Sequence, residues 1–334
     1  MWRILFAFIV AFVLCAGLMP LVVRLCKKLK ARQTILHYVD NHAGKSGTPT
    51  MGGIGFLLAI VAASLIFMRE NSVLMVVALL VTVGYGVVGF LDDFIKIFFK
   101  QNKGLSPWQK ILFQGLIAFV VSFFAYYHQT IAGAVYIPFT LHRVSFGWLS
   151  VPFFAVIFLA FTNAVNLTDG LDGLASSVTL VYMLFQAALL FIALYFFGDE
   201  RGFRPEYINL IVFCAAVVGA LVGFLCYNGF PAKIFMGDTG ALALGGAVGS
   251  VAVVSGMALY SPIIGIMYVI TCLSVMIQVA HFKRTKGKRI FLMAPIHHHF
   301  ERKGIHENRI VAWYTAITAV IGSLCLMITI MVVS

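Results

Sequence analysis

The chain has 334 residues, of which 24 are Lys or Arg and 12 are Asp or Glu, so its formal net charge is +12. Charged residues make up 11% of the chain and apolar residues 61%, with a mean hydropathy of +0.99, whereas charged residues are about 25% of an ordinary soluble domain. This composition excludes a soluble globular enzyme, a secreted disulfide scaffold and a disordered chain. It indicates an integral membrane protein.

Ten apolar runs follow one another along the chain, each about as long as the 20 or so residues of a membrane-spanning helix. They cover residues 4–24, 51–68, 73–91, 111–128, 148–165, 174–197, 208–227, 240–259, 262–281 and 310–332. The runs are uniformly apolar and lack the alternation of a transmembrane β-barrel. The sequence therefore predicts an all-α, polytopic integral membrane protein with ten transmembrane helices and one transmembrane domain over residues 1–334.

The positive charges predict the orientation. With the N-terminus outside, 19 of the 24 Lys and Arg residues fall on the inner side, as the positive-inside rule requires. An even number of spans then places both termini outside. The main inner loops cover about 25–50, 92–110, 166–173, 228–240 and 282–309, and we expect the active site to be built from them. The six cysteines show no C-x-x-C spacing, which argues against a thiolate metal site.

Five aspartates stand beside predicted inner ends of spans: Asp92, Asp93, Asp169, Asp172 and Asp238. A carboxylate next to hydrocarbon is costly and usually has a partner or a function. Helix capping by Asp172 or Asp238 is the structural alternative.

The adjacent pair Asp92 and Asp93 needs a nearby cation, because two neighbouring carboxylates repel each other. Lys96 has salt-bridge spacing from both if the helix continues. A Mg²⁺ ion, which prefers oxygen ligands, would serve equally well.

On a helix, Asn166, Asp169 and Asp172 would share one face. Gly170 and Gly173 interrupt that pattern and allow backbone amides to approach a ligand. The segment predicts the end of a span that turns into a polar, ligand-binding loop.

His297, His298 and His299 lie in the largest inner loop, close to a run of Lys and Arg residues. Three consecutive histidines cannot easily bind one zinc ion from a regular helix or strand, so phosphate binding or proton transfer fits better. A surface loop with chance histidines is the alternative. The segment 45–53 is not a Walker A loop, because Lys45 precedes the glycines, although it could offer Lys45 and backbone amides to an anion.

Three classes of function can be compared. A transporter usually places its ionisable groups near the membrane midplane, whereas these carboxylates gather at one face. An intramembrane aspartyl protease would have Gly-x-Gly-Asp, but Phe235 occupies the first glycine position. An enzyme that joins a soluble phosphate compound to a membrane lipid needs metal ligands and a basic anion pocket on the cytosolic face, and both are present.

The motifs resemble those of a known superfamily. Asp92–Asp93, the segment 166–173 and the segment 228–240 are similar to motifs of the polyprenyl-phosphate N-acetylhexosamine-1-phosphate transferases. The segments 45–53 and 295–301 resemble the branch of phospho-N-acetylmuramoyl-pentapeptide transferases, or translocase I, and the resemblance covers the whole chain.

This resemblance implies a Mg²⁺-dependent enzyme of the bacterial inner membrane. Its substrates would be UDP-N-acetylmuramoyl-pentapeptide and undecaprenyl phosphate, and its products lipid I and UMP, in the first membrane step of peptidoglycan synthesis and cell wall biogenesis. The alternative donor is UDP-N-acetylglucosamine, used by a neighbouring branch. Relatives imply a homodimer in the lipid bilayer, and no nucleic-acid partner is expected.

The resemblance also implies residue roles. Asp92, Asp93, Asp238 and His298 would be catalytic, and Asp238, with Asn166 nearby, would hold Mg²⁺. Substrate contacts would come from Lys45, Lys110, Asn166, Asp169, Asp172, Asn228, Phe235, Gln278, His297 and His299, with Phe235 stacked on uracil. Which aspartate acts as base, nucleophile or ligand stays open. Direct attack by the lipid phosphate is favoured, because a phosphate monoester is mostly dianionic at neutral pH.

Overall fold

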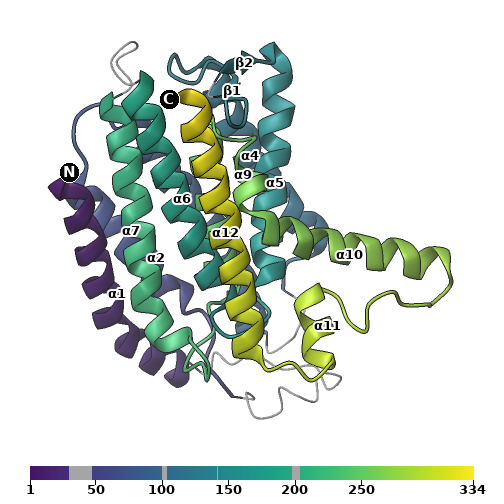
Figure 1. Ribbon diagram of the computed structural model, residues 1–334. Coiled ribbons are helices and arrows are strands. Elements are labelled where there is room, and N and C mark those ends of the chain that lie inside the picture. Colours follow the sequence, from purple (N-terminus) through teal and green to yellow (C-terminus); the bar gives the residue numbers. More distant parts are fainter. Residues whose placement is uncertain (30–46, 100–103, 141, 198–203) are drawn as a thin grey trace.

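The computed structural model describes residues 1–29, 47–99, 104–140, 142–197 and 204–334 (Figure 1). Its helices are α1 (Trp2–Lys28), α2 (Gly53–Phe67), α3 (Val73–Phe98), α4 (Pro107–Tyr127), α5 (Ser150–Thr168), α6 (Leu174–Phe197), α7 (Arg204–Asn228), α8 (Gly237–Val254), α9 (Ser261–Ile264), α10 (Ile266–Arg284), α11 (Ile296–Arg302) and α12 (Glu307–Val333). Two short strands, β1 (Ala134–Tyr136) and β2 (Arg143–Ser145), precede a 3₁₀ turn over Gly147–Leu149.

Nine helices of the described chain are long and apolar enough to cross a membrane. The all-α, multi-pass architecture is thereby confirmed. The predicted span 51–68 corresponds to α2, which has only 15 residues, fewer than the roughly 20 of a typical crossing. The count of ten crossings stays a prediction.

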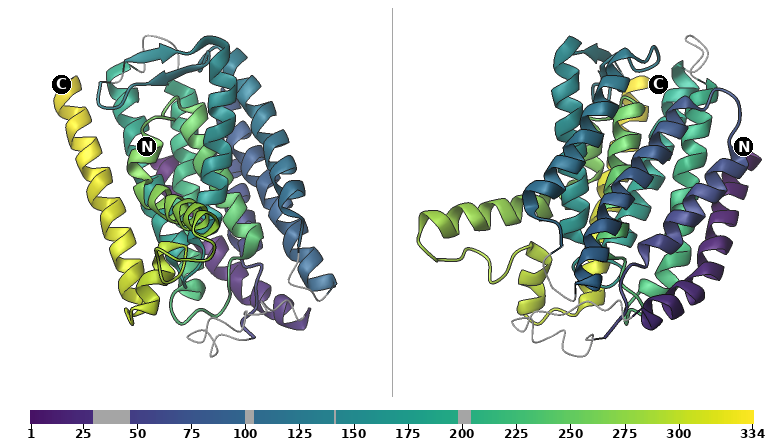
Figure 2. Two further views of the ribbon diagram at one scale, coloured as in Figure 1. Left: turned by 90° about the vertical axis from the view of Figure 1, so that its right-hand side faces the viewer. Right: turned by 180° about the vertical axis from the view of Figure 1, so that it is seen from behind.

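Both ends of the chain lie toward the same end of the bundle, and α11 lies at the opposite end (Figure 1). The first end also carries an antiparallel hairpin of β1 and β2, in which Val135 pairs with Val144 (Figure 2). The apolar runs gave no indication of this hairpin, because each of its strands is only three residues long.

Helix α8 lies in the interior of the bundle, and every residue from Thr239 to Val254 is buried. Its glycines bring it close to its neighbours: a Cβ at Gly245 would lie 2.5 Å from Thr162 Cα on α5, and one at Gly246 would lie 2.7 Å from the Tyr85 ring on α3. In a bilayer, such small residues allow the close van der Waals packing that holds helices together.

The predicted apolar run 262–281 forms a long apolar helix over most of its length but is interrupted near its start. The chain forms α9, turns at Gly265 and continues as α10, which runs outward from the bundle (Figures 1 and 2). Gln186 Nε2 donates to Tyr182 Oη at 2.6 Å and to Ser261 Oγ at 2.8 Å near this break. Irregular backbone inside a membrane protein is tolerated where it is buried against other protein segments, and Ser261 and Ile264 of α9 are buried.

Packing of α1 against α7 can be tested at Gly219, where an added Cβ would collide with the carbonyl oxygen of Phe8. We expect Gly219→Val to lower the free energy of unfolding by about 1–3 kcal/mol, because it overpacks a tight crossing. Thermal unfolding in detergent measures the effect. Gly17→Val on α1 is the matched control, because nothing lies within 4 Å of its Cβ. Equal losses in the two variants would contradict the assigned crossing.

Candidate active site

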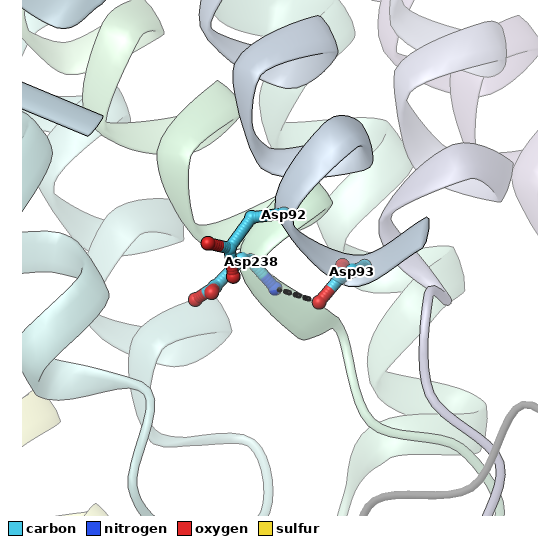
Figure 3. Close-up of side chains that lie close together, drawn as sticks. All are labelled: Asp92, Asp93 and Asp238. Carbon is cyan, nitrogen blue, oxygen red and sulfur yellow. Dashed lines mark hydrogen bonds between the residues drawn. The ribbon is translucent and has the colours of Figure 1, made fainter. Parts of the chain in front are cut away.

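Three aspartates from two helices form a compact group. Asp92 and Asp93 lie near the end of α3, and Asp238 lies in the first turn of α8. One carboxylate oxygen from each lies within 4.8 Å of the other two. Figure 3 shows the Asp92 and Asp238 side chains next to each other, with Asp93 to their right and hydrogen-bonded to the Asp238 amide. The structure thus brings together aspartates that are about 145 positions apart in the sequence.

Two lysines compensate these carboxylates. Lys96 Nζ lies 2.6 Å from Asp92 Oδ2 and 2.7 Å from Asp238 Oδ2. Lys110, from the first turn of α4, places its Nζ 3.1 Å from the same Asp238 oxygen. The predicted Lys96–Asp92 pair is confirmed, because α3 continues past both residues to Phe98. Buried charges need such partners to offset their lost hydration.

Asn166 joins the group from the last turn of α5. Its Nδ2 donates to Asp238 Oδ1 at 2.7 Å, so residues of three helices, α3, α4 and α5, contact the Asp238 carboxylate. The Asp238 carboxylate therefore binds the side chains of the cluster. It does not act as the side-chain cap of α8, the alternative that the sequence left open.

The donor set fits a hard divalent cation. Carboxylate and side-chain amide oxygens, as the aspartate group and Asn166 offer, are the ligands that Mg²⁺ prefers. Mg²⁺ is usually held by one or two carboxylates together with substrate phosphates. Lys96 and Lys110 share Asp238 Oδ2, whereas Asp238 Oδ1 accepts from Asn166.

The segment after α5 is a loop, as predicted, because α5 ends at Thr168 and α6 begins at Leu174. Asp172 Oδ2 accepts from the Ala232 amide at 2.9 Å, and its own amide donates to Glu307 Oε1. Asp172 therefore fastens this loop to the segment before α8 and to the start of α12.

Asp169 is half-buried at the C-terminal end of α5. Burial, followed by the nearby charges of Asp238, Asp93 and Asp172, raises the pKa of Asp169 to about 8. Nearby negative charges disfavour the ionised form of a carboxyl group. A cation bound at the aspartate cluster would lower the pKa of Asp169 again, because it would offset the negative charge.

The histidine motif lies on α11 and contacts the loop after α5. His297 is fully buried, and a Cβ at Gly170 would collide with His297 Nε2 and lie 3.0 Å from His298 Nε2. His298 Nδ1 lies 2.9 Å from Glu301 Oε2, with both side chains mostly buried. Such a carboxylate fixes the orientation of an imidazole ring. His297 and His298 are therefore held in place by the protein, which excludes a loop with chance histidines.

His299 points to a different part of the loop. Its Nδ1 accepts from the Leu292 amide at 3.1 Å. Burial, followed by the nearby charge of Lys303, lowers the pKa of His299 from its ordinary value.

Three further predicted contact residues bind neighbouring backbone. Asn228 Nδ2 donates to the Ile234 carbonyl at 3.0 Å. Gln278 Oε1 accepts from the amides of residues 290 and 291, at 3.1 and 3.0 Å. Phe235 is half-buried, and its amide donates to the Pro49 carbonyl at 2.8 Å. In the structure, Asn228 and Gln278 shape the loops that precede α8 and follow α10.

The segment 47–53 also binds the backbone before α8. The amides of Gly52 and Gly53 donate to the carbonyls of Phe235 and Met236, each at 2.9 Å. Two amides expected to serve an anion are therefore used within the protein. Lys45 lies outside the described residues.

Sequence reasoning missed Thr239 and Glu307. Thr239 donates to Asp93 through both its amide and its hydroxyl, at 2.8 and 2.7 Å. The only sequence feature that could have indicated a role for Thr239 is its position next to Asp238. Glu307 reaches the Asp172 amide from 135 residues away, and no local pattern indicates such a contact.

Comparisons with known proteins point to one family. Residues 74–256 match the model of glycosyl transferase family 4, and residues 45–57 match signature 1 of the phospho-N-acetylmuramoyl-pentapeptide-transferases. The phospho-N-acetylmuramoyl-pentapeptide-transferase of Clostridium kluyveri is 43% identical over 325 residues, which cover 96% of this chain and 98% of the relative. That of Clostridium perfringens strain 13 is 44% identical, covering 95% and 96%, and that of Clostridium novyi is 42% identical, covering 95% and 94%.

Gly170→Ala tests the contact between the loop and α11. The new methyl group would displace the His297 and His298 rings, so we expect turnover to fall roughly tenfold or more, as misplaced active-site groups often cause. Activity and unfolding temperature of the purified protein measure this. Gly115→Ala on α4 is the control, because nothing lies within 4 Å of its Cβ. Undiminished turnover of the Gly170 variant would contradict a role for these histidines.

Proposed function

The chain belongs to the phospho-N-acetylmuramoyl-pentapeptide transferase family, and we propose that it transfers phospho-N-acetylmuramoyl-pentapeptide from UDP to undecaprenyl phosphate. The products are lipid I and UMP, in the first membrane step of peptidoglycan synthesis. The observation that carries this function is the contact of Asp92, Lys96, Lys110 and Asp238 at one end of an apolar bundle. Transfer between two phosphate compounds chiefly needs groups that position them and neutralise their charge.

We propose that Asp238 and Asn166 hold Mg²⁺, with the donor diphosphate bound beside them. When bound, Mg²⁺ supplies positive charge that stabilises the diphosphate and the departing UMP. The closeness of the two side chains, with Asn166 Nδ2 2.7 Å from Asp238 Oδ1, supports this assignment. Lys110 and His298 then face the donor phosphates, and Phe235, Asn228, Asp169 and Asp172 surround the nucleotide and sugar.

An oxygen of the lipid phosphate attacks the β-phosphorus of the donor, and the bond from this phosphorus to the bridging oxygen breaks, so that UMP leaves. We assign the orientation of the lipid phosphate to Asp92 and Lys96. Asp92 is itself fixed, because its Oδ1 accepts from the Leu105 amide at 2.8 Å and its Oδ2 binds Lys96. No covalent enzyme intermediate is required, since the phosphate is mostly dianionic at neutral pH.

We also propose that the protein crosses the bacterial inner membrane ten times, with both termini outside and the active site facing the cytoplasm. The distribution of Lys and Arg supports this orientation. The position of both chain termini toward the same end of the bundle supports it as well (Figure 1). A homodimer stays a prediction from the family resemblance.

A donor comparison tests the reaction. The purified protein is incubated with Mg²⁺, undecaprenyl phosphate and either UDP-N-acetylmuramoyl-pentapeptide or UDP-N-acetylglucosamine, and the lipid product and UMP are quantified. We expect lipid I from the first donor only. Product from the second donor alone would move the protein to the neighbouring branch of transferases.

Asp238→Asn tests the metal assignment. We expect turnover to fall about 100-fold or more, because the variant loses the anionic ligand that would hold the charge-neutralising cation beside the reacting phosphates, and we expect weaker Mn²⁺ binding in spectroscopic titrations. Glu70→Gln is the control variant, because it also removes one carboxylate charge. Glu70 is exposed and lies in the segment before α3, away from the cluster at the other end of that helix. Full activity of Asp238→Asn in Mg²⁺ would overturn this assignment.

A further inference from the structure

Asp93 binds the backbone of α8. Its Oδ2 accepts from the Thr239 amide at 2.8 Å and from the Thr239 hydroxyl at 2.7 Å, and its Oδ1 accepts from the Asp238 amide at 3.2 Å. The first amides of a helix have no partner within that helix, and a carboxylate is the favoured acceptor at this positively polarised end. Asp93 of α3 therefore caps α8 from a neighbouring helix.

The two adjacent carboxylates of α3 make different contacts. Asp92 approaches the Asp238 side chain, and the two share Lys96. Asp93 approaches the Asp238 backbone, and Figure 3 shows this hydrogen bond to the amide nitrogen. The two aspartates look equivalent in the sequence, but Asp92 lies beside the Asp238 carboxylate whereas Asp93 binds the Asp238 backbone.

Glycines bring α3 close enough for this cap. Gly89 lies one turn before Asp93, and a Cβ there would collide with the Asp238 carbonyl oxygen. Gly237 has a φ of +73°, and a Cβ there would lie 2.6 Å from Asp93 Oδ2. The backbone of the first α8 turn therefore lies in close contact with α3. The hydrogen bonds from Asp93 fix the orientation of this turn.

We propose that Asp93 and Thr239 are a positioning pair that fixes the Asp238 carboxylate, and that Asp93 neither transfers a proton nor binds the metal. The inference rests on the proposed function, in which Asp238 holds Mg²⁺. It follows from burial, since Asp93 is 4% exposed, and from the kind of partner. Both Asp93 oxygens bind the first turn of α8, through two backbone amides and the Thr239 hydroxyl, whereas the Asp238 carboxylate contacts the side chains of Lys96, Lys110 and Asn166. Catalytic groups must be held within about 0.5 Å of their productive position, and Asp238 is one residue from the capped amide.

Thr239→Val is the most informative variant, because it removes the hydroxyl that binds Asp93 and keeps the side-chain size. We expect kcat to fall roughly tenfold, Mn²⁺ binding to weaken severalfold, and the KM for the UDP donor to change little. Thr239→Ser keeps the hydroxyl and should restore kcat and Mn²⁺ binding. Thr82→Val is the matched control, since the Thr82 hydroxyl is also buried and donates to the Ala78 carbonyl of its own helix, at 2.7 Å.

A double-mutant cycle separates positioning from direct chemistry. If the pair acts as one unit, Asp93→Asn combined with Thr239→Val should be no worse than Asp93→Asn alone. Normal kcat and Mn²⁺ binding in Thr239→Val, with kcat abolished in Asp93→Asn, would overturn the proposal, as would a loss no larger than that of Thr82→Val.

Unfolding temperatures are measured for every variant, and Thr239→Ala replaces Thr239→Val if the latter does not fold. Mn²⁺ titration needs no turnover, so it tests the positioning pair even if the wild-type protein fails to make lipid I. Failure of the proposed reaction is thereby distinguished from failure of this inference.

Discussion

The structure depends on the compensation of buried charge where α3, α4 and α8 meet. Asp92 and Asp238 share the ammonium of Lys96, and Lys110 adds a second positive charge. In so apolar a bundle, removing one partner would leave a charge without hydration, which costs far more than an exposed ion pair contributes. The site is therefore assembled as one ionic unit, and the helices must be placed so that all of its members meet.

Small residues allow that placement. At Gly89, α3 approaches the Asp238 carbonyl, and at Gly53, α2 approaches Gly240, where a Cβ would collide with its backbone. Larger side chains would separate these helices by more than the reach of a carboxylate. Close helix packing, which stabilises membrane proteins through van der Waals contact, is here also what brings the reactive side chains into hydrogen-bonding distance.

Hydropathy predicted most of the fold, because a helix in lipid satisfies its own backbone and so reveals itself in a local apolar run. The Lys96–Asp92 pair was predictable for the same reason, since both residues share one helix. The break at Gly265 was not, because its polar surroundings include Gln186 on another helix. The cap of α8 by Asp93 joins residues about 145 positions apart, so two adjacent aspartates looked alike in the sequence.

The loop after α5 shows that several polar residues of the motifs bind other parts of the protein. At the start of this loop, Asn166 donates a hydrogen bond to Asp238. Near its end, Asp172 binds the Ala232 amide through its side chain and Glu307 through its own amide. Between them, the His297 and His298 rings of α11 pack against Gly170. The aspartate cluster and the histidine helix are thus held in one frame. Since the protein contributes mainly position and charge to phosphoryl transfer, residues that only hold this frame matter as much as those that touch phosphate.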